Sequence, residues 1–571
     1  MHTAHETLTY CELDERSDRA AGALAEAGIP AGSIVAISSS RTPDPYVALL
    51  GALKAGCGYL PLDFDDPQDR IRFMLDDAGA VAVVARRAEL DGAEWLHDTG
   101  LLLIGVDELP AVAPTYPAPV HDTERICYII YTSGTTGVPK GVRITEKNLV
   151  NFTHWFVGAH EVTAHDRLAQ TAPLTFDPSV QQIFPAWVTG SCLVPVAERE
   201  LYDPFAMMAW LAAERISVID VVTAQWHHWR EAAVHDAALR SLPDLRWIVV
   251  GGETLYHHES RRWHSTVESP ALLRNIYGPT EATINASETV VDPETCQGQV
   301  SIGVPLPNYR LYVVDATDQL CPLDVTGELL IAGDGVAAGY QSAEATAKAF
   351  GEIKLPDGTV ERIYRTGDLA RLVREANGAL VIDFVGRMDT QVKIRGFRIE
   401  LEEIEAVAKT ADGVRDAAVQ LRSGSAEQLA CFYVADDRTD DAPVRAHLAA
   451  HLAGHQMPNL MLRLDVFPVT RNGKLDRPAL AAALEETLLH RSPSGARPGT
   501  AEQLLVAEAW SEVLGIGQVA LDENFFALGG TSLLAVSLVR ALRARGLKVL
   551  PSDLFAAPTV RELAQLHAAV Q

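Results

Sequence analysis

The sequence predicts an α/β protein with a large first part, a smaller second part and a helical bundle at the end. Apolar runs of strand length alternate with helix-like segments from Leu8 to about Phe384, which is typical of a largely parallel sheet covered by helices. A shorter alternation follows from Asp389 to about Glu485. The last residues have helical periodicity and no convincing strand. At 571 residues the chain exceeds a single core, so we expect two to four domains.

The elements of the first part follow from short apolar runs. Strands are expected at residues 33–37, 81–84, 101–104, 126–130, 247–250 and 311–314, where apolar residues form runs of strand length. Helices are expected at residues 47–55 and 206–213.

The second part opens with a strand at residues 391–394 and a helix at 400–409. Residues 489–500 are rich in Pro, Gly and Ser, which is typical of a linker. Thr500 and Gln503 then form a capping box for a helix that runs to about Leu514. We therefore divide the chain into residues 1–388, 389–487, a linker at 488–499, and 500–571.

Composition narrows the classes of partner. Hydrophobic residues make up 48% and charged residues 22%, as in an ordinary globular protein. A net charge of −27 argues against a nucleic-acid backbone or an anionic membrane as partner. There is no apolar run of membrane-spanning length and no basic-then-apolar start typical of a signal peptide. The seven cysteines lack a Cys-x-x-Cys pair, so we expect buried free thiols and a cytoplasmic location.

The segment from Tyr131 to Lys140 (Tyr-Thr-Ser-Gly-Thr-Thr-Gly-Val-Pro-Lys) carries the clearest chemistry. It is expected to form a loop between the strand at 126–130 and a helix near Glu146. Glycines let a backbone approach a polyanion, and hydroxyls and an ammonium bind its oxygens. Lys140 follows Pro139 rather than a glycine, so this is not a Walker P-loop. A polar surface turn is the alternative, but ATP binding is favoured, with candidate residues Thr132, Ser133, Gly134, Thr135, Thr136, Gly137 and Lys140.

Further segments occur in a fixed order along the chain. They are residues 8–13 (Leu-Thr-Tyr-Cys-Glu-Leu), 53–63 (Leu-Lys-Ala-Gly-Cys-Gly-Tyr-Leu-Pro-Leu-Asp), 176–179 (Phe-Asp-Pro-Ser), 275–281 (Asn-Ile-Tyr-Gly-Pro-Thr-Glu), 327–329 (Gly-Glu-Leu), 364–369 (Tyr-Arg-Thr-Gly-Asp-Leu), 386–389 (Gly-Arg-Met-Asp), 391–396 (Gln-Val-Lys-Ile-Arg-Gly), 472–477 (Asn-Gly-Lys-Leu-Asp-Arg) and 528–533 (Leu-Gly-Gly-Thr-Ser-Leu). With them, the chain resembles the adenylation domains of nonribosomal peptide synthetases, in the adenylate-forming superfamily, followed by a peptidyl carrier domain. The resemblance implies a large multi-sheet adenylate-forming N-terminal lobe, a small mobile α+β C-terminal lobe and an all-α four-helix carrier bundle.

The resemblance assigns roles at the nucleotide. It implies that Tyr277 stacks on adenine, Thr280 binds the α-phosphate and Glu281 holds Mg²⁺, which prefers oxygen ligands. Asp368 would accept the ribose hydroxyls and Arg387 would assist at the ribose or a phosphate. The alternative is a structural role as a turn or surface residue. Further implied ATP contacts are Gly251, Gly252, Glu253, Asn275, Gly278 and Lys474.

Three residues outside the nucleotide motifs complete the implied machinery. Lys474, on an Asn-Gly-Lys turn, would be solvated if it had no function, but the resemblance makes it a catalytic residue together with Thr280 and Glu281. Its ammonium would bridge the substrate carboxylate and the α-phosphate. Asp389 resembles the hinge about which the smaller lobe turns. Ser532 follows a Gly-Gly turn and would carry 4′-phosphopantetheine; a helix-capping serine is the alternative.

The implied reaction has two half-reactions. An amino-acid carboxylate attacks the α-phosphate of MgATP and releases pyrophosphate. The smaller lobe then turns, withdraws Lys474 and presents the loop around Gly396, and the phosphopantetheine thiol attacks the aminoacyl-adenylate and releases AMP. None of the seven cysteines needs to be catalytic, because the arm supplies the thiol.

The substrate pocket is also assigned by resemblance. Its positions are Asp177, Pro178, Gln181, Asp220, Ile248, Val250, Ile276, Ile284, Asn285 and Lys474. Asp177 stands where the family binds an α-ammonium, so an α-amino acid is expected. Asp220, Asn285 and Gln181 would be costly to bury unpaired, which favours a side chain rich in donors, including a cationic one.

Three alternatives remain. An aryl- or acyl-acid ligase with a fused carrier would differ only in substrate. A free-standing acyl-CoA ligase or luciferase-like enzyme is disfavoured by Ser532. A catalytically silent scaffold is disfavoured because Lys474, Glu281 and Asp368 are all present. Expected partners are a phosphopantetheinyl transferase, condensation, thioesterase or tailoring enzymes in trans, and an MbtH-like activator. Only seven residues precede the segment at 8–13, so we expect either a trimmed chain or an unusual start.

Overall fold

The computed structural model describes most of the chain. Its description leaves out residues 4–5, 117–121, 135–137, 198–199, 202, 295–297, 376, 395, 423–426, 436–440, 471–473, 491–494, 531, 548 and 571. Within helices, the side chains of residues 532–533, 551–552, 555 and 567–570 are also left out. The chain forms two compact units: the first contains Met1–Gly134, Pro139–Ala197 and Met208–Arg398, and the second contains Ile399–Gln571 with two short earlier segments.

The first unit contains two seven-stranded sheets. One has the order β16 (Gly339–Tyr340), β6 (Lys140–Thr145), β5 (Ile126–Thr132), β2 (Gly58–Leu62), β1 (Ile34–Ser38), β3 (Ala80–Ala85) and β4 (Leu102–Gly105). The other has the order β13 (Val304–Pro305), β12 (Ser287–Val290), β11 (Leu272–Tyr277), β10 (Trp247–Gly251), β9 (Val218–Val222), β7 (Arg167–Gln170) and β8 (Cys192–Pro195). Most of their pairings are parallel, as the sequence predicts.

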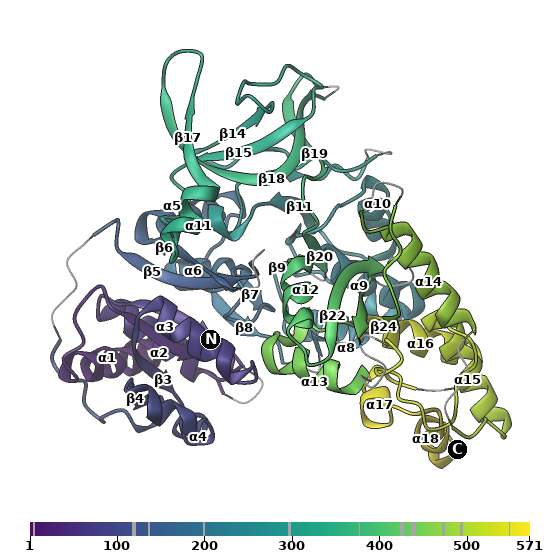
Figure 1. The fold of residues 1–571 in the computed structure, drawn as a ribbon. Coiled ribbons are helices and arrows are strands. Elements are labelled where there is room, and N and C mark those ends of the chain that lie inside the picture. Colours follow the sequence, from purple (N-terminus) through teal and green to yellow (C-terminus); the bar gives the residue numbers. More distant parts are fainter. Residues whose placement is uncertain are drawn as a thin grey trace. The chain divides into compact units, whose positions relative to one another are not determined.

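A third sheet of the first unit is antiparallel throughout, which the alternation pattern did not predict. It contains β14 (Tyr309–Val314), β15 (Gly327–Gly333), β18 (Val360–Arg374), β17 (Phe350–Lys354) and β19 (Leu380–Arg387) (Figure 1). Its strands follow one another with few helices between them. Short connections of this kind join antiparallel strands, whereas parallel strands need a longer crossover.

The helices of this part of the chain flank the parallel sheets. They are α1 (Tyr10–Glu26), α2 (Asp44–Lys54), α3 (Gln68–Ala78), α4 (Arg87–Gly92), α5 (Glu146–Ala159), α6 (Pro178–Thr189), α8 (Pro204–Ala213), α9 (Thr223–His235), α10 (His257–Thr266) and α11 (Ala343–Ala349). Phe152, Phe156 and Ile183 of α5 and α6 share one buried cluster with Tyr128 of β5 and Val249 of β10. This apolar layer joins the two parallel sheets into one core.

The loop after β5 differs in one respect from the prediction. Lys140 does not lie in a loop that leads directly to a helix, because it begins strand β6, which pairs antiparallel with β5 and places Lys140 opposite Thr132. The predicted helix follows β6 as α5, with Thr145 and Asn148 forming its capping box. Strands β5 and β6 are therefore consecutive antiparallel strands. Residues 135–137, which come between them in sequence, lie outside the described residues.

The smaller part combines short strands with helices, as predicted. It begins with β20 (Val392–Ile394) and β21 (Phe397–Ile399), which belong to the first unit as far as Arg398. In the second unit follow α12 (Leu401–Lys409), β22 (Val414–Arg422), β23 (Gln428–Ala435), α13 (Asp441–His451), β24 (Leu460–Leu464) and α14 (Arg477–His490). Strands β22, β23 and β24 form a sheet, and Phe432 and Leu460 pack with Leu480 and Leu484 of α14.

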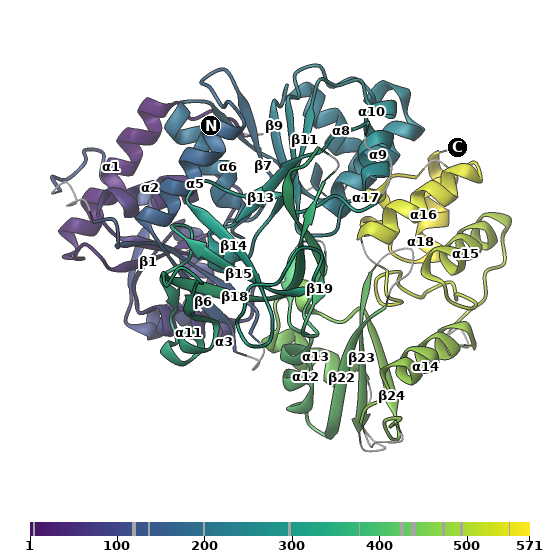
Figure 2. The ribbon, with the colours of Figure 1, turned by 90° about the horizontal axis from the view of Figure 1, so that it is seen from above.

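Four helices form the end of the chain, which confirms the predicted bundle (Figure 2). They are α15 (Ala501–Leu514), α16 (Ser532–Ala544), α17 (Pro551–Ala556) and α18 (Val560–Val570). The Thr500–Gln503 capping box is present at α15. Trp510 and Phe525 pack edge to face, with ring centroids 5.1 Å apart, in a core that includes Leu538 and Leu542.

Within the second unit the bundle contacts the sheet of the smaller part. Gln428 at the start of β23 donates a hydrogen bond from Nε2 to the carbonyl of Gly529, at 2.5 Å. Arg422 at the end of β22 donates to the carbonyl of Leu514 at 3.3 Å and to Oε1 of Gln428 at 2.7 Å. A Cβ added at Gly529 would lie 2.6 Å from Leu460, so this approach requires glycine.

Free cysteines are found at the six positions that can be assessed. Cys57, Cys127 and Cys431 are buried, as expected, but Cys11 is exposed. Cys296 lies outside the described residues. Among the described residues, no helix is both long and apolar enough to cross a membrane.

Candidate functional site: a pocket at the carboxyl edge of the second parallel sheet

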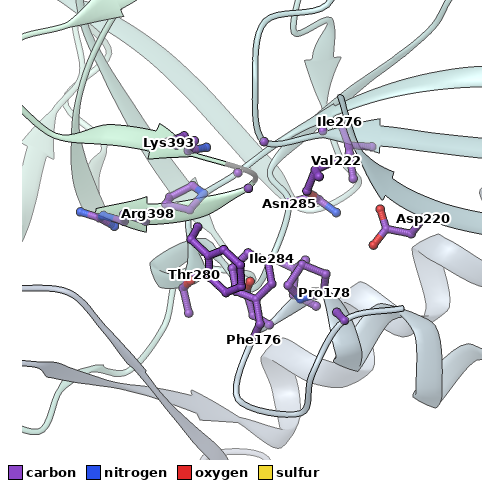
Figure 3. Close-up of a pocket in the computed structure, with 18 of the residues that line it drawn as sticks. Phe176, Pro178, Asp220, Val222, Ile276, Thr280, Ile284, Asn285, Lys393 and Arg398 are labelled. Atoms are coloured by element: carbon purple, nitrogen blue, oxygen red, sulfur yellow. The ribbon is translucent and has the colours of Figure 1, made fainter. Parts of the chain in front are cut away.

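A pocket opens where strands β9, β10 and β11 end. Parallel strands present their carboxyl ends at one edge, and ligands of open α/β sheets bind there. The following residues line the pocket: Thr171, Ala172, Pro173, Phe176, Asp177, Pro178, Gln181, Gln182, Asp220, Val221, Val222, Gln225, Gly251, Gly252, Ile276, Tyr277, Gly278, Pro279, Thr280, Ile284, Asn285, Thr366, Asp368, Arg387, Gln391, Lys393, Gly396, Phe397 and Arg398. Figure 3 shows Asp220 and Asn285 toward one end, and Lys393 and Arg398 toward the other.

Asp177 lies at the start of helix α6 and is 6% exposed. Burial raises the pKa of its carboxyl to about 7, although a hydrogen bond with Thr280 opposes the shift; the charge of Glu281 adds to it. A cation that enters the pocket would favour the ionised form of this buried carboxyl group. The position therefore suits an ammonium group.

Glu281 is fully buried behind the pocket and is held by two partners. Arg398 donates to both of its carboxylate oxygens, at 3.0 and 2.9 Å, and the hydroxyl of Tyr340 donates to Oε1 at 2.5 Å. Burial alone would raise the pKa of Glu281, but the charge of Arg398 and the Tyr340 bond bring it below its usual value. The Nζ of Lys140 lies 5.7 Å from the centre of the Tyr340 ring, so β6 places its ammonium near this carboxylate.

A second polar cluster surrounds Tyr277. Its hydroxyl donates to Oδ2 of Asp368, and Arg387 donates to the other oxygen of Asp368. Arg387 also forms two hydrogen bonds with Asp389, both at 2.7 Å. The Nζ of Lys393 lies 6.0 Å from the centre of the Tyr277 ring. One cluster thus contains an aromatic face, a carboxylate and cations, which are the groups that can bind a ribonucleotide.

The chain turns tightly after β11, and this turn brings side chains into the pocket. Thr280 and Glu281 lie in a short 3-10 turn, after which Thr283 and Ile284 have φ angles of 56° and 73°. Two successive β-branched residues in this region are strained and persist only where the surroundings hold them. Thr283 donates to the carbonyl of Gly335 at 2.7 Å, and a Cβ at Gly278 would lie 2.4 Å from the Cα of Asn285. The close packing directs Ile284 and Asn285 at the pocket.

The pocket gathers most of the residues that the sequence proposed. Asp177, Pro178, Gln181, Asp220, Ile276, Ile284 and Asn285 line it together with Gly251, Gly252, Tyr277, Gly278, Thr280, Asp368 and Arg387. Ser133 lies nearby, because its hydroxyl donates to the carbonyl of Arg398 at 2.9 Å. Ile248 and Val250 are buried in β10, and they are outside the described lining, as are Thr132, Gly134, Lys140, Glu253 and Asn275.

Five proposed positions lie elsewhere or are not fully described. Lys474 is in the second unit and exposed, and its carbonyl accepts a hydrogen bond from the N–H of Thr470 at 2.7 Å. Ser532 begins helix α16, but its side chain is not described. Thr135, Thr136 and Gly137 lie outside the described residues.

Sequence reasoning missed several lining residues. Lys393 belongs to the segment at 391–396 that resembles the family, but no role was given to its side chain, and Arg398 follows that segment by two residues. Phe176 and Phe397 stack with ring centroids 5.1 Å apart and cover part of the pocket. Gln182 could have been found from helical spacing, because it follows Pro178 by four residues and shares its face.

The residues at Glu281 fit a magnesium ion in donor type and charge. Glu281 is a carboxylate whose lowered pKa keeps it ionised, and Mg²⁺ is bound by one or two carboxylates together with substrate phosphates. Within the described ranges, no group of three or more His, Cys, Asp or Glu residues is arranged to hold a metal ion.

Comparison with known proteins decides the family. The AMP-binding enzyme family matches residues 1–341, more than half of the chain. The chain belongs to the AMP-binding enzymes. The phosphopantetheine attachment site family matches residues 505–566, which include α16.

A curated relative and two solved structures agree with this assignment. The chain is 34% identical to bacitracin synthase 3 of Bacillus licheniformis over 98% of its own length, but it spans only 8% of the length of that protein. The structure of holo-PA1221, an NRPS protein containing adenylation and PCP domains bound to a vinylsulfonamide inhibitor, matches with a TM-score of 0.81 and 26% identity, over 99% of this chain and 92% of that one. Holo-AB3403, a four-domain nonribosomal peptide synthetase bound to AMP and glycine, matches with a TM-score of 0.59 and 30% identity, over 99% of this chain and 41% of that one.

Proposed function

We propose that this AMP-binding enzyme activates an α-amino acid with ATP and transfers it to a phosphopantetheine arm on Ser532. The observation that carries the proposal is Asp177, a buried carboxylate with a raised pKa in the same pocket as the Tyr277–Asp368–Arg387 cluster. One end of the pocket thus suits a nucleotide and the other an amino acid. The phosphopantetheine family match at residues 505–566 supports the second step.

In the first step the amino-acid carboxylate attacks the α-phosphorus, and pyrophosphate leaves. Asp177 holds the α-ammonium, Thr280 donates to the α-phosphate, and Asp368 holds the ribose. Lys474 provides an ammonium between the carboxylate and the phosphate, where negative charge develops. A bound magnesium ion, held by Glu281 and phosphate oxygens, would neutralise part of the phosphate charge.

In the second step the thiol sulfur of the arm attacks the acyl carbon of the aminoacyl-adenylate. The bond to the phosphate oxygen breaks, the thiol loses its proton and AMP leaves. Lys474 must leave the site before the thiol enters, and we propose a rotation near Asp389 for this exchange. We also propose the domain limits: residues 1–388 form the large lobe, 389–487 the small lobe and 500–571 the carrier domain.

The proposal includes partners and a location. A phosphopantetheinyl transferase would load Ser532, and condensation, thioesterase or tailoring enzymes would use the aminoacyl thioester. An MbtH-like protein is a candidate activator, and the cytoplasm is the proposed location because the arm needs reduced thiol chemistry.

ATP–pyrophosphate exchange with a panel of amino acids tests the first step. Exchange that depends on one α-amino acid supports the proposal. Exchange that depends instead on an aryl or fatty acid without an amine would favour the acid-ligase alternative and refute the role of Asp177. Mass measurement of the intact protein after treatment with a transferase, coenzyme A, ATP and the amino acid tests the second step.

A further inference from the structure

At the far end of the pocket, hydrogen-bond partners determine which atom of each side-chain amide is the oxygen and which is the nitrogen. Oε1 of Gln182 accepts hydrogen bonds from the backbone N–H groups of Thr171 and Ala172, both at 3.0 Å. Backbone N–H groups can only donate, so this atom must be the amide oxygen. The nitrogen of Gln182 therefore faces Oδ2 of Asp220, at 3.0 Å, and Oγ1 of Thr171, at 3.0 Å.

The same reasoning extends from Asp220 to the next two amides. Gln181 acts as a hydrogen-bond donor that lowers the pKa of Asp220, so its amide nitrogen faces that carboxylate and its oxygen faces away. That oxygen accepts from Nδ2 of Asn285 at 2.7 Å. The amide nitrogens of Gln182, Gln181 and Asn285 all donate to protein acceptors, and the oxygen of Asn285 is the end of the chain of bonds.

This end of the pocket therefore presents hydrogen-bond acceptors to a ligand. A carboxylate has about four lone-pair sites, and Asp220 keeps acceptor capacity beyond its amide partners. Glu281 pairs with Arg398 and Asp368 with Arg387, whereas no described lysine or arginine forms an ion pair with Asp220. Burial raises the pKa of Asp220 to about 6, so the group remains mostly ionised near neutral pH. A buried carboxylate without a protein cation is costly unless the ligand supplies the charge.

The walls between the two ends are apolar. Ile276 is 6% exposed and Ile284 is 4% exposed, and both line the pocket with Pro178 and Val222. Such walls suit the aliphatic stem of a long side chain that ends in a polar group. Figure 3 shows Pro178 and Ile284 between Asp220 on one side and Lys393 and Arg398 on the other.

We propose that the pocket selects an α-amino acid whose side chain ends in a guanidinium or ammonium group. Asp220 binds the cation, the oxygen of Asn285 accepts one of its hydrogen bonds, and Gln182 is a positioning residue that holds Asp220. The inference rests on the proposed amino-acid activation and adds the class of side chain.

Matched pairs of amino acids test the inference in the pyrophosphate-exchange assay. Arginine should be preferred over citrulline, or lysine over norleucine, by about 10²-fold or more in kcat/KM. The neutral amino acid of each pair is similar in size to the cationic one but has no charged group for Asp220 to bind. Calorimetric titration with the corresponding aminoacyl sulfamoyl-adenosines reads binding without turnover. A preference for a neutral or acidic side chain in both assays would overturn the inference while leaving amino-acid activation intact. Exchange with acids that lack an α-amine would overturn the proposed function instead.

Two variants test the named residues. Asp220→Asn keeps the shape and removes the charge, so the preference for the cation over its neutral partner should fall below about tenfold. Gln182→Met should raise KM for the cationic amino acid with little change in kcat or in KM for ATP, since Gln182 acts through Asp220. Gln299→Met, at an exposed position outside the pocket lining, is the matched control. An unchanged preference in Asp220→Asn would refute the role of Asp220.

Discussion

Arg398 donates to both carboxylate oxygens of Glu281, at 3.0 and 2.9 Å, and the Glu281 side chain is fully buried. The arginine belongs to β21 and the glutamate follows β11, so the pair joins the last strand of the first unit to the rim of the pocket. Arg398 thus compensates the buried charge of Glu281 and fixes the orientation of its carboxylate, at the place where phosphates and a metal ion are expected to bind.

Removing the arginine should therefore destabilise the first unit. Arg398→Met leaves the Glu281 charge buried without a cation, which costs about 3–5 kcal/mol for a buried pair. Urea unfolding followed by tryptophan fluorescence measures the loss. Arg371→Met is the matched control, because Arg371 and Asp383 form a pair that is 46% and 29% exposed. Such surface pairs contribute about 1 kcal/mol or less. Equal losses in the two variants would contradict the importance of the buried pair.

Lys474→Ala should separate the two half-reactions. Adenylate formation should fall by about 10²–10³-fold, as for the loss of one donor to a transition state. Thioester formation from a supplied aminoacyl-adenylate should change far less, because Lys474 has left the site by then. Pyrophosphate exchange measures the first step and intact mass the second. An equal fall in both would exclude the two-state mechanism.

Ser532→Ala should abolish loading of the arm and leave pyrophosphate exchange close to that of the unmodified sequence. The reason is that Ser532 begins α16 in the bundle, whereas the pocket is formed by residues of the first unit. Mass measurement after treatment with a transferase and coenzyme A decides the result. A modified Ser532→Ala protein would place the attachment site on another residue.

The Michaelis constant for the amino acid should depend on pH. Burial raises the pKa of Asp177 to about 7, and an α-ammonium binds the ionised form. As the pH falls below about 7, the carboxyl takes up a proton and KM should rise by about tenfold per pH unit. Asp177→Asn should lose the dependence near pH 7 and keep only the one from Asp220, whose pKa is raised to about 6. A flat profile with the original aspartate would mean that Asp177 does not bind the amine.

Much of the fold could be predicted from local patterns. The strands β1, β3, β4, β10 and β14 coincide with apolar runs, and the cap at Thr500 was readable from two residues. Strand β6 was missed because Lys140 to Thr145 are a mixed polar and apolar run with no turn residue before Glu146. The antiparallel pairing of β14 with β15 was not predicted, because the periodicity of a strand does not report the direction of its neighbour.

The site was predictable where motifs determine it and not where packing does. Asp177, Tyr277 and Asp368 were identified from short segments and meet in one pocket. The partner of Glu281 was not predicted, because Arg398 lies 117 residues away in sequence. The direction of the Gln182 amide could not be predicted either, since it is determined by backbone N–H groups at the end of β7.

That amide direction limits how the enzyme could be re-engineered. Replacing Asp220 with leucine to admit an apolar substrate would remove the acceptor of the Gln181 nitrogen and one of the two acceptors of the Gln182 nitrogen, which keeps Oγ1 of Thr171. A buried donor that is left unsatisfied costs about 1–3 kcal/mol. A single substitution should therefore give a weak enzyme rather than a new specificity. Because Gln182 is held by the main chain, a successful redesign would have to change Asp220, Gln181 and Gln182 together.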